Sequence, residues 1–161
     1  MFSGVFPASL VNPEFRGTTG RIFQEEVLGS CVVRAHGKMK FYASLKEVLA
    51  NQPANTFKQN TEAHRFYTAV YNRVRDVGLD PKKLQVRSAI GSNLDWHGVD
   101  GVFTYEGIIV TVDCTINPHK DSTKARVLVT GDDLLTGYKD SASEIAFHFK
   151  KARQFGWKGV V

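Results

Sequence analysis

The stretch GVDGVFTYEGIIVTVDCT, residues 98–115, decides the fold of this chain. Apolar and β-branched residues dominate 99–105 and 108–116, which predicts two strands. Between them, Glu106 and Gly107 are typical of a tight hairpin turn. The second strand has so few polar residues that we expect it to be buried on both faces.

The turn sets the register of this hairpin, and the register brings two acids together. If Tyr105 pairs with Ile108 beside the turn, Asp100 lies opposite Asp113. Opposed residues in an antiparallel pair point to the same face, with Cβ atoms about 5 Å apart. Two carboxylates so close repel each other by roughly 1 kcal/mol unless a cation lies between them. The alternative is a register slipped by one residue, which would leave Asp100 in a loop and Asp113 facing solvent.

The elements around the hairpin predict an α/β (α+β) fold. Apolar residues at steps of three and four predict a long helix over 61–78, and a strand is expected over 84–91. After the hairpin, 125–130 reads as a further strand and 141–156 as a capped helix. We therefore expect a mixed central sheet of about four to five strands flanked by helices.

The remaining segments predict a single domain with an irregular beginning. We expect an arm over 1–20, a helix over 21–30, a hairpin over 31–44, a helix over 44–51 that starts with a capping box, and loops over 51–60, 92–98 and 131–140. The predicted organisation is one domain, 1–161, with an arm and short helices over 1–59, a core over 60–130 and a C-terminal helix over 140–156.

Composition restricts the kinds of protein this chain can be. Its 161 residues are 42% hydrophobic, which suits one domain with a core, and no apolar run approaches the roughly 18 residues that cross a bilayer. Two distant cysteines predict neither a disulfide framework nor a zinc cluster. No secretory signal is evident, so we expect a cytoplasmic protein without a membrane partner. The net charge of +5 favours a polyanionic partner such as nucleic acid.

The stretch RSAIGSNLDWHGVDGVFTYEGIIVTVDCT, residues 87–115, resembles the PD-(D/E)XK nuclease superfamily, which has the restriction-endonuclease-like αβββαβ core. The resemblance covers residues 60 to about 130. It implies that Asp100 and Asp113 are the two acids that bind the metal. It also implies that the Cys114 carbonyl is a further metal ligand, and that Glu62 is the acid many members carry on the preceding helix.

The chain departs from the pattern of this superfamily at the lysine. Thr115 occupies that position and supplies no positive charge. Either a basic group reaches the site from elsewhere or the site is degenerate. Lys120 is the residue we select for the missing cation, and His119 and Lys124 are the other nearby candidates; the alternative is that Lys120 is a solvated loop lysine.

Several other residues are candidates for contact with nucleic acid. His97 precedes the first acid by three residues, and Lys150, Lys151 and Arg153 lie near the end of the last helix. These three cations also complement the helix dipole, which is a sufficient structural reason for them. Trp96 either stacks on a base or covers the edge of the core, and we favour the second reading.

Taken together, the sequence predicts a metal-dependent nuclease that hydrolyses phosphodiester bonds of DNA (or RNA). Mg²⁺ or Mn²⁺ is the expected cofactor, because these ions take a few carboxylate oxygens and fill their remaining positions with water. The alternative is a catalytically inactive module that binds nucleic acid or another protein on the same fold. The sequence leaves open endonuclease or exonuclease action and a homodimer, and its compact form suits a phage protein.

Overall fold

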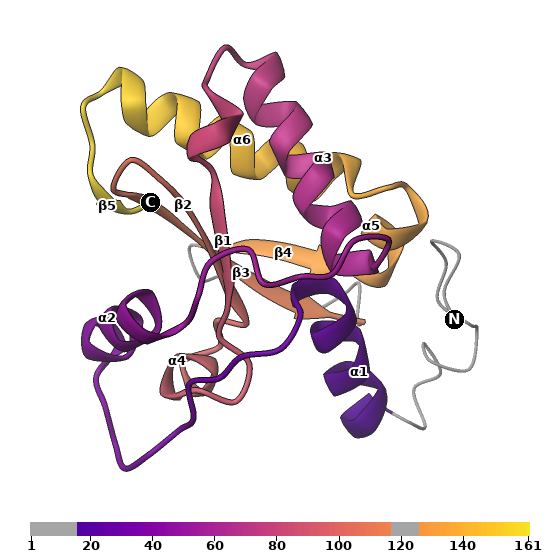
Figure 1. Cartoon of the computed structure of the whole chain (residues 1–161), viewed down its shortest axis with the longest axis vertical. Helices are drawn as coiled ribbons and strands as arrows, with labels where there is room; N and C mark the ends of the chain where they lie inside the picture. The colour runs from indigo at the N-terminus through magenta and orange to yellow at the C-terminus, as the bar shows by residue number, and fades with distance from the viewer. Residues whose placement is uncertain (1–15, 117–125) are drawn as a thin grey trace.

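A computed structural model describes residues 16–116 and 126–161 of the chain. Figure 1 shows a twisted sheet with helices around it. In chain order the elements are α1 (Arg16–Leu28), α2 (Phe41–Asn51), α3 (Glu62–Asp76), the 3₁₀ helix η3 (Pro81–Lys83), β1 (Gln85–Ser88), α4 (Asn93–Trp96), β2 (Gly101–Tyr105), β3 (Ile108–Thr115), β4 (Val127–Thr130), α5 (Gly131–Leu135), α6 (Lys139–Gln154) and β5 (Gly159–Val160).

The sheet is mixed, which confirms the predicted fold class. Strands β1, β2 and β3 form an antiparallel meander, and β4 lies parallel to β3 on its other edge. The short β5 also pairs with β3 in parallel, next to Ile108 and Ile109. β3 is therefore the central strand, and its apolar sequence matches burial on both faces.

The predicted register of the hairpin is confirmed. Tyr105 pairs with Ile108 and Gly101 pairs with Val112, while the Asp100 amide donates to the Val112 carbonyl at 2.8 Å. The two turn residues both have positive φ, 47° at Glu106 and 83° at Gly107. Two positive φ values are the signature of the turn whose twist matches paired antiparallel strands.

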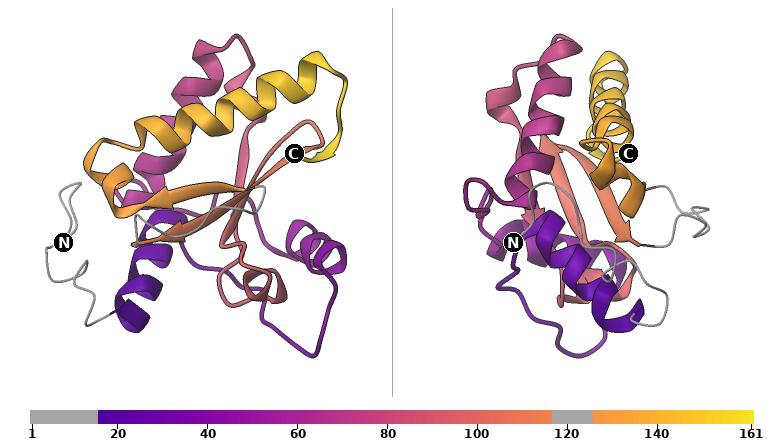
Figure 2. Two further views of the ribbon diagram at one scale, coloured as in Figure 1. Left: turned by 180° about the vertical axis from the view of Figure 1, so that it is seen from behind. Right: turned by 90° about the vertical axis from the view of Figure 1, so that its right-hand side faces the viewer.

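Helices cover both faces of the sheet. On one face, α1, α3 and α6 pack on Phe103, Val110 and Val112 to form the larger core. On the other face, α2 and α4 pack on Val102 in a smaller core. Figure 2 shows α3 and α6 side by side, with α1 and α2 toward the opposite end of the molecule.

Several predicted boundaries are wrong. Helix α1 begins at Arg16, within the predicted arm, and it packs on α3 and β3 with Phe23, Val27 and Leu28 in the larger core. A Cβ added at Gly101 would lie only 2.7 Å from Leu28 of α1, which shows how closely this helix approaches β2. Helix α2 begins at Phe41, three residues before the predicted capping box. Short helices α4 and α5 replace two predicted loops.

The hairpin predicted over 31–44 is also wrong, because residues 31–40 form an irregular segment that contains no strand. Their backbone groups bond to distant partners: the Ala35 amide donates to the Gly91 carbonyl at 2.9 Å, and the Val32 amide donates to the Gln52 side chain at 2.8 Å. These bonds satisfy buried backbone groups without a strand partner.

Among the described residues, no helix is both long enough and apolar enough to cross a bilayer.

Candidate functional site: a cluster of buried carboxyl groups

The two acids of the hairpin lie side by side and are almost fully buried, with 2% of Asp100 and 5% of Asp113 exposed. Asp100 directly precedes β2 and continues the pairing of the strands, since its carbonyl accepts from the Ala89 amide at 2.8 Å. Its Oδ2 accepts from the Cys114 amide, also at 2.8 Å. The backbone of both neighbouring strands therefore fixes the position of the Asp100 carboxyl group.

A third carboxyl group, which the sequence analysis missed, joins this pair. Asp95 lies on the short helix α4, which Ser92 caps at its N-terminus, and its Oδ2 accepts from the Gly91 amide at 2.8 Å. Asp100 forms side-chain hydrogen bonds with both Asp113 and Asp95. The only signal in the sequence was an acid five residues before Asp100, between two glycines that allow a compact turn.

This environment raises the pKa of Asp100 to about 9. Burial is the largest cause, followed by the hydrogen bonds to Asp113 and Asp95, and the Cys114 amide opposes the shift. Asp100 therefore keeps its proton at neutral pH when no cation is bound. A bound cation would favour the ionised carboxylate, which is the behaviour expected of a ligand.

Two arginines lie near the acids. Arg21 of α1 forms an ion pair with Glu25 at 2.8 Å, which is the main cause that raises the pKa of Arg21, and Asp95 and Asp100 add to it. A Cβ added at Gly91 would lie 3.2 Å from its guanidinium group.

The second arginine, Arg126, donates hydrogen bonds to the carbonyls of His97 and Gly98, on the segment that leads to Asp100. Together with Arg21 it brings positive charge to the surroundings of the acids, at positions that the sequence analysis did not consider.

The residues after Asp113 divide between the two faces of the sheet. The Cys114 side chain lies in the larger core, and its carbonyl accepts from Gln24 of α1 at 3.3 Å. Because successive side chains alternate, Asp113 and Thr115 point to the other face, where Thr115 is half-buried beside β4. The structure thus brings together four predicted residues: Asp100, Asp113, Cys114 and Thr115.

The oxygen atoms of Asp100, Asp113 and the Cys114 carbonyl fit a hard cation that keeps much of its water. Within 16–116 and 126–161, no group of three or more His, Cys, Asp and Glu side chains is arranged to hold a metal. Mg²⁺ needs less than this, because it is usually bound through one or two carboxylates with water at its other positions. Asp100, Asp113 and the Cys114 carbonyl would supply such a partial set, and Gln24 would have to share the carbonyl.

Glu62 does not belong to this cluster. It is 1% exposed and accepts from the Tyr138 hydroxyl and from Arg65 Nη1, both at 2.7 Å. Its neighbour Tyr138 belongs to the larger core, on the face opposite to the Asp113 side chain. The partners of Glu62 therefore give it a structural role, and its predicted contact with a metal stays a prediction.

The predicted contacts to nucleic acid are scattered. His97 Nε2 bonds to the Met39 carbonyl at 2.8 Å, and Arg153 pairs with Glu106 at the hairpin turn. Lys150 and Lys151 are exposed on the same helix as Arg153, α6. His119, Lys120 and Lys124 lie outside the described residues, so their predicted roles stay predictions.

A hollow on the surface of the described residues lies away from the acids. A cavity of about 580 Å³ is bordered by α3 and by the start of α6, with Arg65, Arg73, Arg75 and Lys139 among its lining residues. The three acids line neither this cavity nor a smaller one of about 300 Å³ beside α1. In this conformation Asp100 and Asp113 are covered by protein, while Asp95 is partly exposed.

No protein-family profile, curated protein or solved structure matches this chain. The geometry of the acid cluster and the resemblance in residues 87–115 are therefore what indicate a function for this chain.

Proposed function

We propose that this protein is a metal-dependent nuclease, which hydrolyses phosphodiester bonds of DNA (or RNA) with Mg²⁺ or Mn²⁺ held by Asp100 and Asp113. The observation that supports this proposal most is the burial of these two acids side by side. Burial beside a second acid raises the pKa of Asp100, and buried acids with a raised pKa are found preferentially at functional sites.

The chain's own residues have separate tasks in this proposal. Asp100 and Asp113 would hold the metal with the Cys114 carbonyl, and the Cys114 amide keeps Asp100 in place. A metal bound there would lower the pKa of a water and offset charge on the phosphate. Lys120 is the proposed source of the missing lysine charge, and Arg21 and Arg126 add positive charge near the acids.

The test is cleavage of plasmid and of single-stranded DNA with Mn²⁺. We expect Asp113→Asn to reduce the cleavage rate by about 100-fold or more, because loss of a metal ligand affects both binding and chemistry. Asp113→Ala should abolish cutting. Circular dichroism and urea unfolding show whether each variant keeps the fold.

Asp76→Asn is the matched control, because it makes the same change at a half-exposed acid on α3. It should cut like the parent protein. If folded Asp113→Asn also cuts like the parent, Asp113 does not bind the catalytic metal and the proposal is wrong.

The second candidate function is a catalytically inactive module that binds nucleic acid or a protein. Two observations favour it: Thr115 stands at the lysine position, and the acids are covered by protein. Tight, salt-sensitive binding to DNA without cutting would support the module that binds nucleic acid. No affinity for DNA or RNA would instead support a protein partner.

A further inference from the structure

The segment RAHGKMKFY, residues 34–42, which we call the basic strap, combines positive charge with aromatic rings. It contains Arg34, Lys38 and Lys40 and no acid. The strap forms no strand, and it ends in the first residues of α2. A segment of this composition on a surface is typical of contact with a polyanion.

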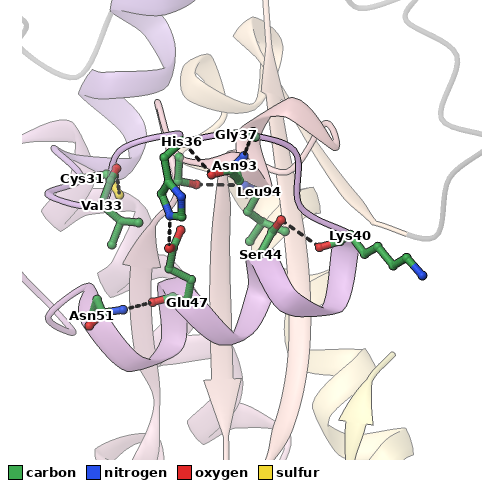
Figure 3. A network of polar contacts seen from close by, with 11 residues as sticks. Cys31, Val33, His36, Gly37, Lys40, Ser44, Glu47, Asn51, Asn93 and Leu94 are labelled. Carbon is green, nitrogen blue, oxygen red and sulfur yellow. Dashed lines mark hydrogen bonds and ion pairs between the residues drawn. The ribbon is translucent and has the colours of Figure 1, made fainter.

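The strap is fastened to the segment that carries Asp95. The Ala35 amide donates to the Gly91 carbonyl at 2.9 Å, and the His36 amide donates to Asn93 Oδ1 at 2.9 Å. Asn93 Nδ2 donates in turn to the Gly37 carbonyl at 3.0 Å. Figure 3 shows Asn93 held between these backbone groups of the strap. The strap therefore lies beside the turn and short helix that hold the acid cluster.

Large aromatic side chains are exposed at the same place. Trp96 is 73% exposed, one residue after Asp95, and Tyr42 at the end of the strap is 68% exposed. The interpretation that Trp96 covers the edge of the core is therefore wrong. Phe41 connects the strap to the end of α4. Its ring centroid lies 5.2 Å from that of Tyr42 and 5.9 Å from that of His97, the residue after Trp96. Exposed aromatic rings offer flat apolar faces on which a partner with flat rings of its own can stack.

The lysines of the strap are available to such a partner. Lys38 and Lys40 are exposed, and neither forms an ion pair within the described part of the chain. Glu47, the first acid after the strap, is engaged by His36. In Figure 3 the Lys40 side chain extends outward from the start of α2. Arg34 bonds to the carbonyls of Cys31 and Val33, so it stiffens the strap.

We propose that the basic strap and Trp96 bind a single strand of DNA and lead it to the acid cluster. Lys38 and Lys40 contact its phosphates, while Trp96 and Tyr42 stack on its bases. Only unpaired bases expose their faces for stacking, which favours a single strand over a duplex. This inference rests on the proposed function, because it names the form of nucleic acid that the same site receives.

The test measures binding apart from cutting. In EDTA, with Asp113→Asn, the affinities for labelled dT15, rU15 and a 15-base-pair duplex are compared by fluorescence anisotropy. We expect dT15 to bind most tightly, and Trp96→Ala to weaken it about tenfold, the usual effect of losing one stacked base. Lys38→Ala/Lys40→Ala should lower the salt slope by about 1.4, because each phosphate contact on a single strand contributes about 0.7.

Tryptophan fluorescence gives a second, direct readout. With Trp157→Phe, Trp96 is the only tryptophan, and dT15 should quench its emission. The matched control for the lysines is Lys82→Ala/Lys83→Ala, which removes two exposed lysines from η3. This control should leave the affinity and the salt slope unchanged.

Failure of the strap inference and failure of the nuclease proposal would give different results. If the duplex binds as well as dT15, and the Trp96 and lysine variants bind like the parent, the inference is wrong even when the parent protein cuts DNA. Tighter binding of rU15 than of dT15 would contradict DNA as the occupant. If the strap variants lose dT15 but the parent protein never cuts with Mn²⁺, the strap is supported and the nuclease proposal fails.

Discussion

Two buried acids on opposite faces of the same sheet, Glu62 and Asp100, differ in the groups that surround them within the described residues. On one face, Glu62 receives hydrogen bonds from a phenol and a guanidinium group. On the other face, the hydrogen-bond partners of Asp100 are the Cys114 amide and two further carboxyl groups, Asp95 and Asp113. Both acids are almost closed to solvent, so burial alone does not separate them.

The difference teaches which buried acid stabilises the fold and which one costs stability. A buried carboxyl group with a cation and a hydroxyl as donors is fully satisfied within the protein. A buried carboxyl group that lies beside other carboxyl groups, as Asp100 does, either keeps its proton or becomes ionised beside a cation. On this argument Glu62 is structural, and the Asp100 cluster is the region adapted to a ligand.

The largest expected effect is a loss of stability on substitution of Glu62. Glu62→Ala removes the acceptor of the buried Tyr138 hydroxyl and leaves a cavity at the start of α3. We expect it to lower the free energy of unfolding by about 3 kcal/mol. Urea unfolding measures the change, and Glu144→Ala, at a half-exposed acid of α6, is the control that should stay within about 0.5 kcal/mol. Equal effects of the two changes would remove the basis of the comparison.

At Asp100 we expect a substitution to raise the free energy of unfolding, whereas Glu62→Ala lowers it. Asparagine resembles the protonated acid, and its oxygen can still accept from the Cys114 amide. We expect Asp100→Asn to raise the free energy of unfolding at pH 8 by about 2 kcal/mol or more, since one unit of pKa shift corresponds to about 1.4 kcal/mol and the pKa of Asp100 is raised by several units. The same variant should lose nuclease activity. A destabilised Asp100→Asn would mean that the cluster contributes to the stability of the fold.

The pH dependence of this gain follows from the raised pKa. Asp100 has a pKa of about 9 in the fold against an ordinary value of 3.8, so the folded protein binds one more proton than the unfolded chain between these values. The stability due to Asp100 is therefore fully present below about pH 4 and is lost as the pH rises toward 9. We expect the advantage of Asp100→Asn over the parent to grow from about pH 5 to about pH 9 in metal-free urea unfolding. An advantage that is constant with pH would contradict the raised pKa.

The smallest expected effect is at Tyr138. Tyr138→Phe keeps the ring that packs against Phe66, with centroids 4.9 Å apart, and removes one donor to Glu62. Because Arg65 still bonds to Glu62, we expect a loss of only about 1 kcal/mol, measured by urea unfolding. A loss as large as that of Glu62→Ala would show that the phenol, and not the whole network, satisfies this acid.

Local patterns in the sequence were sufficient for the hairpin and the long helix. The turn at Glu106 and Gly107 fixes the pairing of β2 with β3, and regular apolar spacing predicts α3. The irregular segment 31–40 could not be predicted, because its partners lie at residues 52 and 91–97 and no local pattern encodes them. β5 was missed for the same reason, since it pairs with β3 from the far end of the chain.

The candidate site was predicted in part. The register alone places Asp100 beside Asp113, because both belong to one hairpin. Asp95 was missed, since the four residues of α4 are too few to show a period. Glu62 was included by resemblance, and the tyrosine that bonds to it is 76 residues away in the sequence. Nothing in the sequence could have shown that this partner was present.

The most direct test of the central claim is a Mn²⁺ soak of crystals of the parent protein, with diffraction data collected near the manganese absorption edge. We predict an anomalous peak between Asp100 and Asp113, about 2.2 Å from a carboxylate oxygen of each, and no such peak in Asp113→Asn. Well-ordered carboxyl groups with only water between them at saturating Mn²⁺ would contradict the claim that this hairpin holds a metal.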